Sequence, residues 1–128
     1  MGHKGDKTMS LKETFIKIRD NYVMNQVQKA EIPVFGPSDI IRYRVTFSGR
    51  VQKVGFRMEV MELAKRLDLT GFCQNLENGD VLAEIQGQEN RIQYLIEFME
   101  SLKRIKIKDK VIEQLSIIEN EVDFVKRK

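Results

Sequence analysis

Histidine and cysteine are almost missing from this chain of 128 residues, which contains one of each. Because His3 is the only histidine, the sequence offers no Ser-His-Asp or Cys-His catalytic arrangement and no His/Cys cluster for zinc. Cys73 has no second cysteine for an intrachain disulfide and no histidine to activate it, so we expect a structural thiol. The sequence therefore predicts no metal and no cofactor.

Long apolar segments and charge of one sign are also scarce. No stretch approaches the ~18 apolar residues of a membrane span, and residues 1–10 lack the apolar run of a signal peptide. The net charge of +3 is far from the concentrated basic stripe of a nucleic-acid-binding domain. Since 41% of the residues are apolar, the chain can bury a modest core. We expect a cytoplasmic protein of one domain, with neither nucleic acid nor membrane as a partner.

The two prolines, Pro33 and Pro37, lie with Gly36 in the segment 32–38, which is typical of a linker. We therefore divide the chain into an N-terminal extension, residues 1–39, and a domain, residues 40–128. In the extension, Ser10 and Glu13 fit a capping box that begins an amphipathic helix of about 20 residues. Its apolar stripe consists of Leu11, Phe15, Ile18, Tyr22 and Val23. The stripe either packs on the domain, which is the commoner arrangement, or pairs with a partner protein or a second copy.

After the linker, the apolar pattern alternates between the period of a strand and that of a helix. Strands are expected over residues 41–47, 71–77, 81–85 and 111–118, with a short fifth strand near Val122 and Phe124, and helices over 56–69 and 92–102. The pair Asn78-Gly79 indicates a hairpin between the second and third strands. This order predicts an α+β, ferredoxin-like βαββαβ sandwich, an antiparallel sheet with two helices on one face. Glu59 and Glu62 are expected on a solvated helix face, and residues 103–110 in a lysine-rich connector.

The junction between the first strand and the first helix of the domain, residues 48–57, contains Gly49 and Gly55 and ends on Arg57. A loop that feeds a helix N-terminus directs several backbone N–H groups at one point, where the helix dipole favours negative charge. Arg57 adds a planar fork of donors that can hold two phosphate oxygens. The loop is not a Walker A loop, because Phe56-Arg57 stands where Lys-Ser/Thr is needed. From these residues alone, an anion site and a tight turn beside a surface ion pair remain equally open.

Two segments of the chain resemble the acylphosphatase family. Gly49-Arg-Val-Gln-Lys-Val-Gly-Phe-Arg57 is similar to the family loop Gly-x-Val-Gln-Gly-Val-x-Phe-Arg, and Gly71-Phe-Cys-Gln-Asn75 to its second motif, Gly-Trp/Phe-x-x-Asn. The resemblance covers residues 40–128 and implies the ferredoxin-like fold. It implies hydrolysis of acyl phosphates to carboxylate and inorganic phosphate without metal, with Arg57 binding the phosphate and Asn75 holding the attacking water. The backbone N–H groups that it places on the phosphate belong to Val51, Gln52, Lys53, Val54 and Gly55.

The chain departs from the family pattern at Lys53, where a glycine is usual. If this residue has a positive φ, its side chain costs on the order of 1 kcal/mol in strain. Phe72 in place of the commoner Trp and Gln74 in place of a basic residue are tolerable. Three hypotheses follow: an acyl phosphate hydrolase, which we favour; a weakly active or inactive module that binds a ligand or protein through the phosphate site or the N-terminal helix; and an RNA-binding domain. The last is disfavoured because the strand Asp80–Gln86 has no aromatic residue for base stacking.

Overall fold

Three helices and five strands lie along residues 10–128, the part of the chain that the computed structural model describes. His3 lies outside the described residues. The helices are α1 (Leu11–Lys29), α2 (Phe56–Arg66) and α3 (Glu89–Ser101). The strands are β1 (Ile40–Arg50), β2 (Thr70–Asn75), β3 (Val81–Gln88), β4 (Lys106–Leu115) and β5 (Phe124–Arg127). None of the described helices combines the length and the apolar character needed to cross a membrane.

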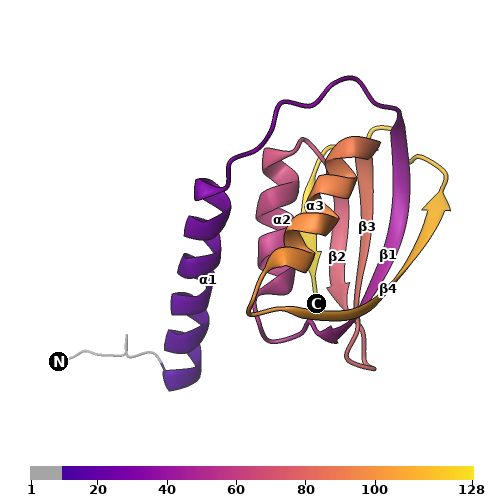
Figure 1. Cartoon of the computed structure of the whole chain (residues 1–128). Coiled ribbons are helices and arrows are strands. Elements are labelled where there is room, and N and C mark those ends of the chain that lie inside the picture. The colour runs from indigo at the N-terminus through magenta and orange to yellow at the C-terminus, as the bar shows by residue number, and fades with distance from the viewer. Residues whose placement is uncertain (1–9) are drawn as a thin grey trace.

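The five strands form one sheet in the order β4-β1-β3-β2-β5. β1 pairs antiparallel with β3 and β4, β2 and β3 form an antiparallel hairpin, and β5 runs parallel to β2. Helices α2 and α3 cover one face of the sheet (Figure 1). The predicted ferredoxin-like arrangement is confirmed, with a fifth strand at the edge.

The core lies between the sheet and the helices α2 and α3. Val45 and Phe47 of β1 are fully buried on this face, as the alternation of apolar residues predicts. The predicted stripe of α3 is buried as well, from Ile92 to Leu102, which is 8% exposed. Phe56 at the start of α2 packs on Phe47, with ring centroids 5.0 Å apart. This contact fixes the start of α2 over the end of β1, where the loop between them must turn.

The prediction for β4 is wrong at its first half. The strand begins at Lys106, inside the segment expected to be a solvated connector, and ends at Leu115. Its pairing with β1 shifts register between Ser48 and Gly49, and a Cβ on Gly49 would lie 2.1 Å from the backbone oxygen of Lys106. β4 is an edge strand, and edge strands tolerate lysine on their open side, so a lysine-rich composition does not exclude pairing.

The face of the sheet opposite the helices carries a buried polar cluster around Arg42, which is 1% exposed. Its guanidinium donates to Glu84 at 3.0 Å, to Gln86 at 3.1 Å and to Glu121 at 2.8 Å. The segment between β4 and β5 is held over these groups by two hydrogen bonds. Gln86 Nε2 donates to the Ile118 carbonyl at 2.9 Å, and the Ile118 N–H donates to Gln86 Oε1 at 2.8 Å. A buried arginine is tolerated here because its donors are satisfied.

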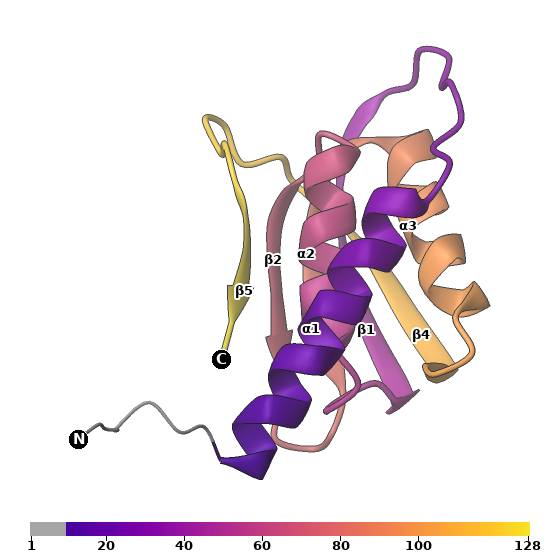
Figure 2. The same cartoon turned by 90° about the vertical axis from the view of Figure 1, so that its left-hand side faces the viewer.

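Helix α1 begins at the predicted capping box, since Ser10 accepts from the Glu13 N–H at 3.1 Å and Glu13 accepts from the Ser10 N–H at 2.9 Å. It forms an outer layer over α2 (Figure 2). The helix packs on the domain through Val23 and Val27, and Arg66 of α2 donates to the Ala30 carbonyl at 3.0 Å. The rest of the predicted stripe is not buried: four of its residues are more than half exposed, namely Leu11, Phe15, Ile18 and Tyr22.

Candidate active site

The loop between β1 and α2 is curled by two residues in the left-handed region, Lys53 with φ 65° and Gly55 with φ 79°. Gly55 is the N-cap of α2, and no side chain caps the first turn. The leading N–H groups of α2 are therefore available to an anion, at the positive end of the helix dipole. Because Lys53 has a positive φ although it is not a glycine, its backbone carries strain on the order of 1 kcal/mol.

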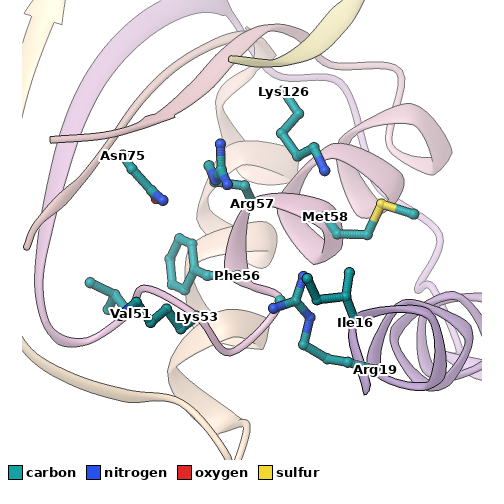
Figure 3. A pocket seen from close by; sticks show the side chains of 10 residues that line it. Ile16, Arg19, Val51, Lys53, Phe56, Arg57, Met58, Asn75 and Lys126 are labelled. Atoms are coloured by element: carbon teal, nitrogen blue, oxygen red, sulfur yellow. The ribbon is translucent and has the colours of Figure 1, made fainter. Parts of the chain in front are cut away.

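A hollow of about 170 Å³ lies against this loop (Figure 3). Arg57 enters it from the first turn of α2 and Asn75 from the end of β2, and Figure 3 shows both side chains directed at the same space. The Asn75 Oδ1 atom is buried and accepts no hydrogen bond from the described residues. Two residues that the sequence separates are thus brought together, as the family resemblance implies.

The guanidinium of Arg57 is positioned by the C-terminal strand. Its Nη1 atom donates to the backbone carbonyl of Arg127 in β5. Arg127 is held in turn by its own side chain, whose guanidinium carbon lies 3.8 Å from the centroid of the Phe72 ring. The short fifth strand therefore contributes to the site, although the sequence gives it no functional residue.

The side chain of Gln52 does not face the hollow. Its Nε2 atom donates to the carbonyls of Leu76 and Asp80, each at 2.8 Å, and so ties the loop to the β2–β3 hairpin. Val51 is buried in the core. The sequence assigns these residues only backbone contacts with phosphate; the side-chain bonds of Gln52 were missed, because the partners lie more than twenty residues away and are backbone atoms.

Glu59 contradicts the prediction of a solvated face. It is fully buried and forms an ion pair with Arg104, whose Nε atom also donates to the Val54 carbonyl at 2.8 Å. Burial raises the pKa of Glu59, against the opposing effect of the Arg104 hydrogen bond and charge. Helical spacing places Glu59 among polar residues, but its ion partner follows α3, and nothing local in the sequence indicates it. Glu62 is half-buried, 3.9 Å from Lys65.

The electrostatic character of the hollow is positive. Four of its ten lining residues are cationic, Arg19, Lys53, Arg57 and Lys126, and none of the described residues that line it is acidic. Cys73 lies in the core below, where burial raises its pKa to about 12, so the thiol stays protonated as expected of a structural residue. Among residues 10–128, no three side chains of His, Cys, Asp or Glu converge as a metal site would need.

An uncapped helix N-terminus and a fork of guanidinium donors are groups that commonly bind phosphate in proteins, and on this ferredoxin-like fold they lie beside one hollow. Comparison with known proteins gives the family. The acylphosphatase family model matches residues 43–126. An acylphosphatase of Clostridium beijerinckii is 38% identical over 89 residues, which are 66% of this chain and 96% of that protein.

Solved structures agree. The crystal structure of acylphosphatase from Bacillus subtilis matches with a TM-score of 0.64 and 29% identity, covering 69% of this chain and 99% of that one. An acylphosphatase from Coxiella burnetii matches with a TM-score of 0.63 and 32% identity, covering 70% and 94%. The chain belongs to the acylphosphatase family, whose members are enzymes that hydrolyse acyl phosphates. The predictions of family and enzyme class are confirmed, and the inactive module is not favoured.

Proposed function

We propose that this site hydrolyses acyl phosphates with Arg57 and the N–H groups of residues 51–55 on the phosphoryl group and Asn75 on the attacking water. The observation that carries the proposal is that Asn75, whose buried Oδ1 atom has no protein donor among the described residues, lines the same hollow as Arg57. A buried acceptor without a donor costs about 1–3 kcal/mol. Because no described residue donates to Asn75 Oδ1, the amide of this side chain is not committed to the fold and is left to hold the attacking water and aim it at the phosphorus.

The chemistry asks little of the protein. The oxygen of water bonds to phosphorus while the bond from phosphorus to the acyl oxygen breaks, and the electron pair leaves with the carboxylate. A carboxylate is the conjugate base of an acid with a pKa of about 4, so it departs without a general acid. The proton of the water goes to a phosphate oxygen or to solvent. Because phosphoryl transfer passes through a loose transition state, positioning and neutralised charge supply most of the catalysis.

We propose that the reaction needs no metal ion, because Arg57, the helix N-terminus and the nearby ammonium groups of Lys53 and Lys126 supply the positive charge that phosphate requires. Arg57 is tied to the Arg127 carbonyl through Nη1, which leaves its other donors for the phosphate oxygens. A lysine cannot reproduce this arrangement, because its ammonium is a point charge without the planar fork.

The test is the release of inorganic phosphate from benzoyl phosphate in the presence of EDTA. We expect turnover above the spontaneous rate, competitive inhibition by inorganic phosphate, and a loss of about 10²–10³ in kcat for both Arg57→Ala and Arg57→Lys. Lys65→Ala, which removes an exposed cation from the same helix, serves as the matched control and should keep the wild-type rate. Wild-type turnover equal to the spontaneous rate would overturn the proposal. Phosphate binding without turnover would instead support the hypothesis of an inactive module that binds a ligand.

Three further proposals come from the sequence. We place the catalytic unit in residues 40–128, and we expect a cytoplasmic protein. Pairing of α1 with a partner protein or a second copy is supported by the exposure of Leu11, at 77%, and Phe15, at 66%. Sedimentation of the full chain, compared with a Leu11→Ser/Phe15→Ser double variant, tests self-association: a single monomeric species in both would count against a second copy.

A further inference from the structure

Helix α1 forms one wall of the candidate active site, although it precedes the residues that the family model matches. Ile16 and Arg19 of α1 line the same hollow as Arg57 and Asn75 (Figure 3). The helix also touches the loop between β1 and α2, residues 51–55, here called the phosphate loop: a Cβ on Gly55 would lie 3.0 Å from Val23 Cγ2 and 3.3 Å from Arg19 Nε. An extension that packs this closely on the loop can contribute to substrate binding.

A single side chain locks α1, the loop and α2 together. Arg104 donates to Gln26 of α1 at 2.9 Å, to the Val54 carbonyl of the loop at 2.8 Å, and to the buried Glu59 of α2. Its guanidinium carbon also lies 5.7 Å from the centroid of the Tyr22 ring. Since Glu59 is fully buried and its other oxygen has no partner among the described residues, the ion pair cannot be exchanged for water without cost. The wall made by α1 therefore has a fixed position relative to the loop.

The order of groups across the hollow places the acyl part of the substrate against α1. In Figure 3, Asn75 lies on one side of Arg57, and Ile16 and Arg19 lie on the other. In phosphoryl transfer the attacking and leaving oxygens are roughly in line on opposite sides of phosphorus. If Asn75 holds the water, the leaving carboxylate and the rest of the acyl group point toward α1.

Arg19 is placed to meet a charge on that acyl group. Its side chain is 30% exposed, and its Nε and Nη2 atoms bind Asp20 Oδ1 at 3.4 and 3.2 Å. Asp20 fixes the direction of the guanidinium but does not line the hollow, and the Nη1 atom makes no hydrogen bond within residues 10–128. In the proposed function, Arg57 and the loop N–H groups already bind the phosphoryl group. A second guanidinium on the acyl side is therefore not needed for phosphate binding.

We propose that Arg19 binds substrate and that it selects acyl phosphates whose acyl portion carries a second anionic group. The inference rests on the proposed function, since it needs Asn75 and Arg57 in the roles given above. Ile16, also on α1, offers an apolar surface to the carbon chain between the two anionic groups. An anionic group within reach of Arg19 gains a charge-assisted hydrogen bond, weakened by the partial exposure of the site.

The test compares 4-carboxybenzoyl phosphate with its neutral analogue of the same shape, 4-carbamoylbenzoyl phosphate, and with unsubstituted benzoyl phosphate. In wild type, we expect kcat/KM to favour the carboxyl over the carbamoyl compound by about fivefold, chiefly through KM, as for a partly exposed ion pair. Arg19→Gln should abolish this preference, and Arg19→Lys should restore part of it. Lys17→Ala removes an exposed cation of the same helix that lines no part of the hollow, and should keep the full preference.

The comparison of two substrates within each variant cancels any change in the amount of folded enzyme. If wild type hydrolyses none of the three compounds, the proposed function and the inference both fail. If wild type hydrolyses all three without preferring the carboxyl compound, or if Arg19→Gln keeps the preference, the inference fails and the proposed function stands. A loss in Arg19→Gln that is equal for the charged and neutral compounds would likewise overturn it, because Arg19 would then serve the phosphoryl group.

Discussion

Replacing Asn75 with alanine should separate catalysis from stability. The side chain lies at the end of β2, its Oδ1 atom is buried, and it makes no hydrogen bond with the described residues. Removing one preorganised polar contact in an active site costs about 3 kcal/mol of barrier, which corresponds to a loss of roughly 10²–10³ in kcat. The same substitution removes a buried acceptor whose desolvation is not repaid, a term of about 1–3 kcal/mol in favour of the variant.

The stability term is opposed by the packing lost when a half-buried side chain is truncated. We therefore expect the free energy of unfolding of Asn75→Ala to stay within about 1 kcal/mol of wild type, or to rise, while turnover collapses. Turnover is measured as phosphate release from benzoyl phosphate, and unfolding in urea is followed by circular dichroism, because the chain has no tryptophan for fluorescence.

Gln74→Ala is the matched control for this experiment. Gln74 is the preceding residue of β2 and carries the same amide group on the opposite face of the sheet, away from the hollow. It should keep the wild-type rate. If Asn75→Ala keeps kcat within about threefold of wild type, the water-positioning role is refuted. If it instead loses more than about 2 kcal/mol of stability, its Oδ1 atom has a structural partner and the argument from an unpaired acceptor fails.

Three other perturbations follow from the structure. Lys53→Gly relieves left-handed backbone strain of about 1–2 kcal/mol but costs about 0.4–1 kcal/mol through the greater entropy of the unfolded chain, so urea unfolding should show a small net stabilisation. KM should rise several-fold, because an ammonium group leaves the hollow. An unchanged KM would contradict this. Glu59 has a raised pKa, so its contribution to stability is fully present below its ordinary pKa of 4.5 and is lost as pH rises through the higher folded value. Relative to wild type, Glu59→Gln should gain stability as pH increases, and parallel curves of unfolding free energy against pH would refute the burial argument. Arg42→Met should cost about 3 kcal/mol, because it leaves Glu121 without its ion partner and Glu84 with Arg44 alone. Arg44→Met, at a side chain 39% exposed, should cost under about 1 kcal/mol. Equal losses would show that burial does not set the cost.

The architecture follows from features that are local in sequence. Alternation in β1 and the apolar spacing of α3 each fix a buried face, and Asn78-Gly79 fixes a hairpin, so periodicity alone leads to the ferredoxin-like order. The two family segments locate Arg57 and Asn75. Their meeting in space is then a property of the fold: β1 and β2 both run antiparallel to β3, so the loop after β1 and the end of β2 lie at the same end of the sheet.

The errors concern contacts between distant residues. Arg104 follows α3, and its pairing with Glu59 depends on how α2, α3 and the loop come together, which no short window of sequence reveals. The buried face of α1 is set by the surface that α2 presents. Val23 and Val27 are therefore buried, while the larger apolar residues Phe15 and Tyr22 stay exposed. The start of β4 is predicted too late in the sequence, because lysine side chains are solvated on an edge strand just as they are in a connector.

The two hydrogen bonds from the Gln52 amide to the carbonyls of Leu76 and Asp80 couple the hairpin tip to the phosphate loop as one rigid piece. Asn75 stands at the base of that same hairpin. Residues 77–79 do not line the hollow, but changes in the length of this turn should shift both halves of the reaction centre at once. Natural or engineered variation in the hairpin tip therefore becomes a means of tuning turnover without altering any group that contacts substrate.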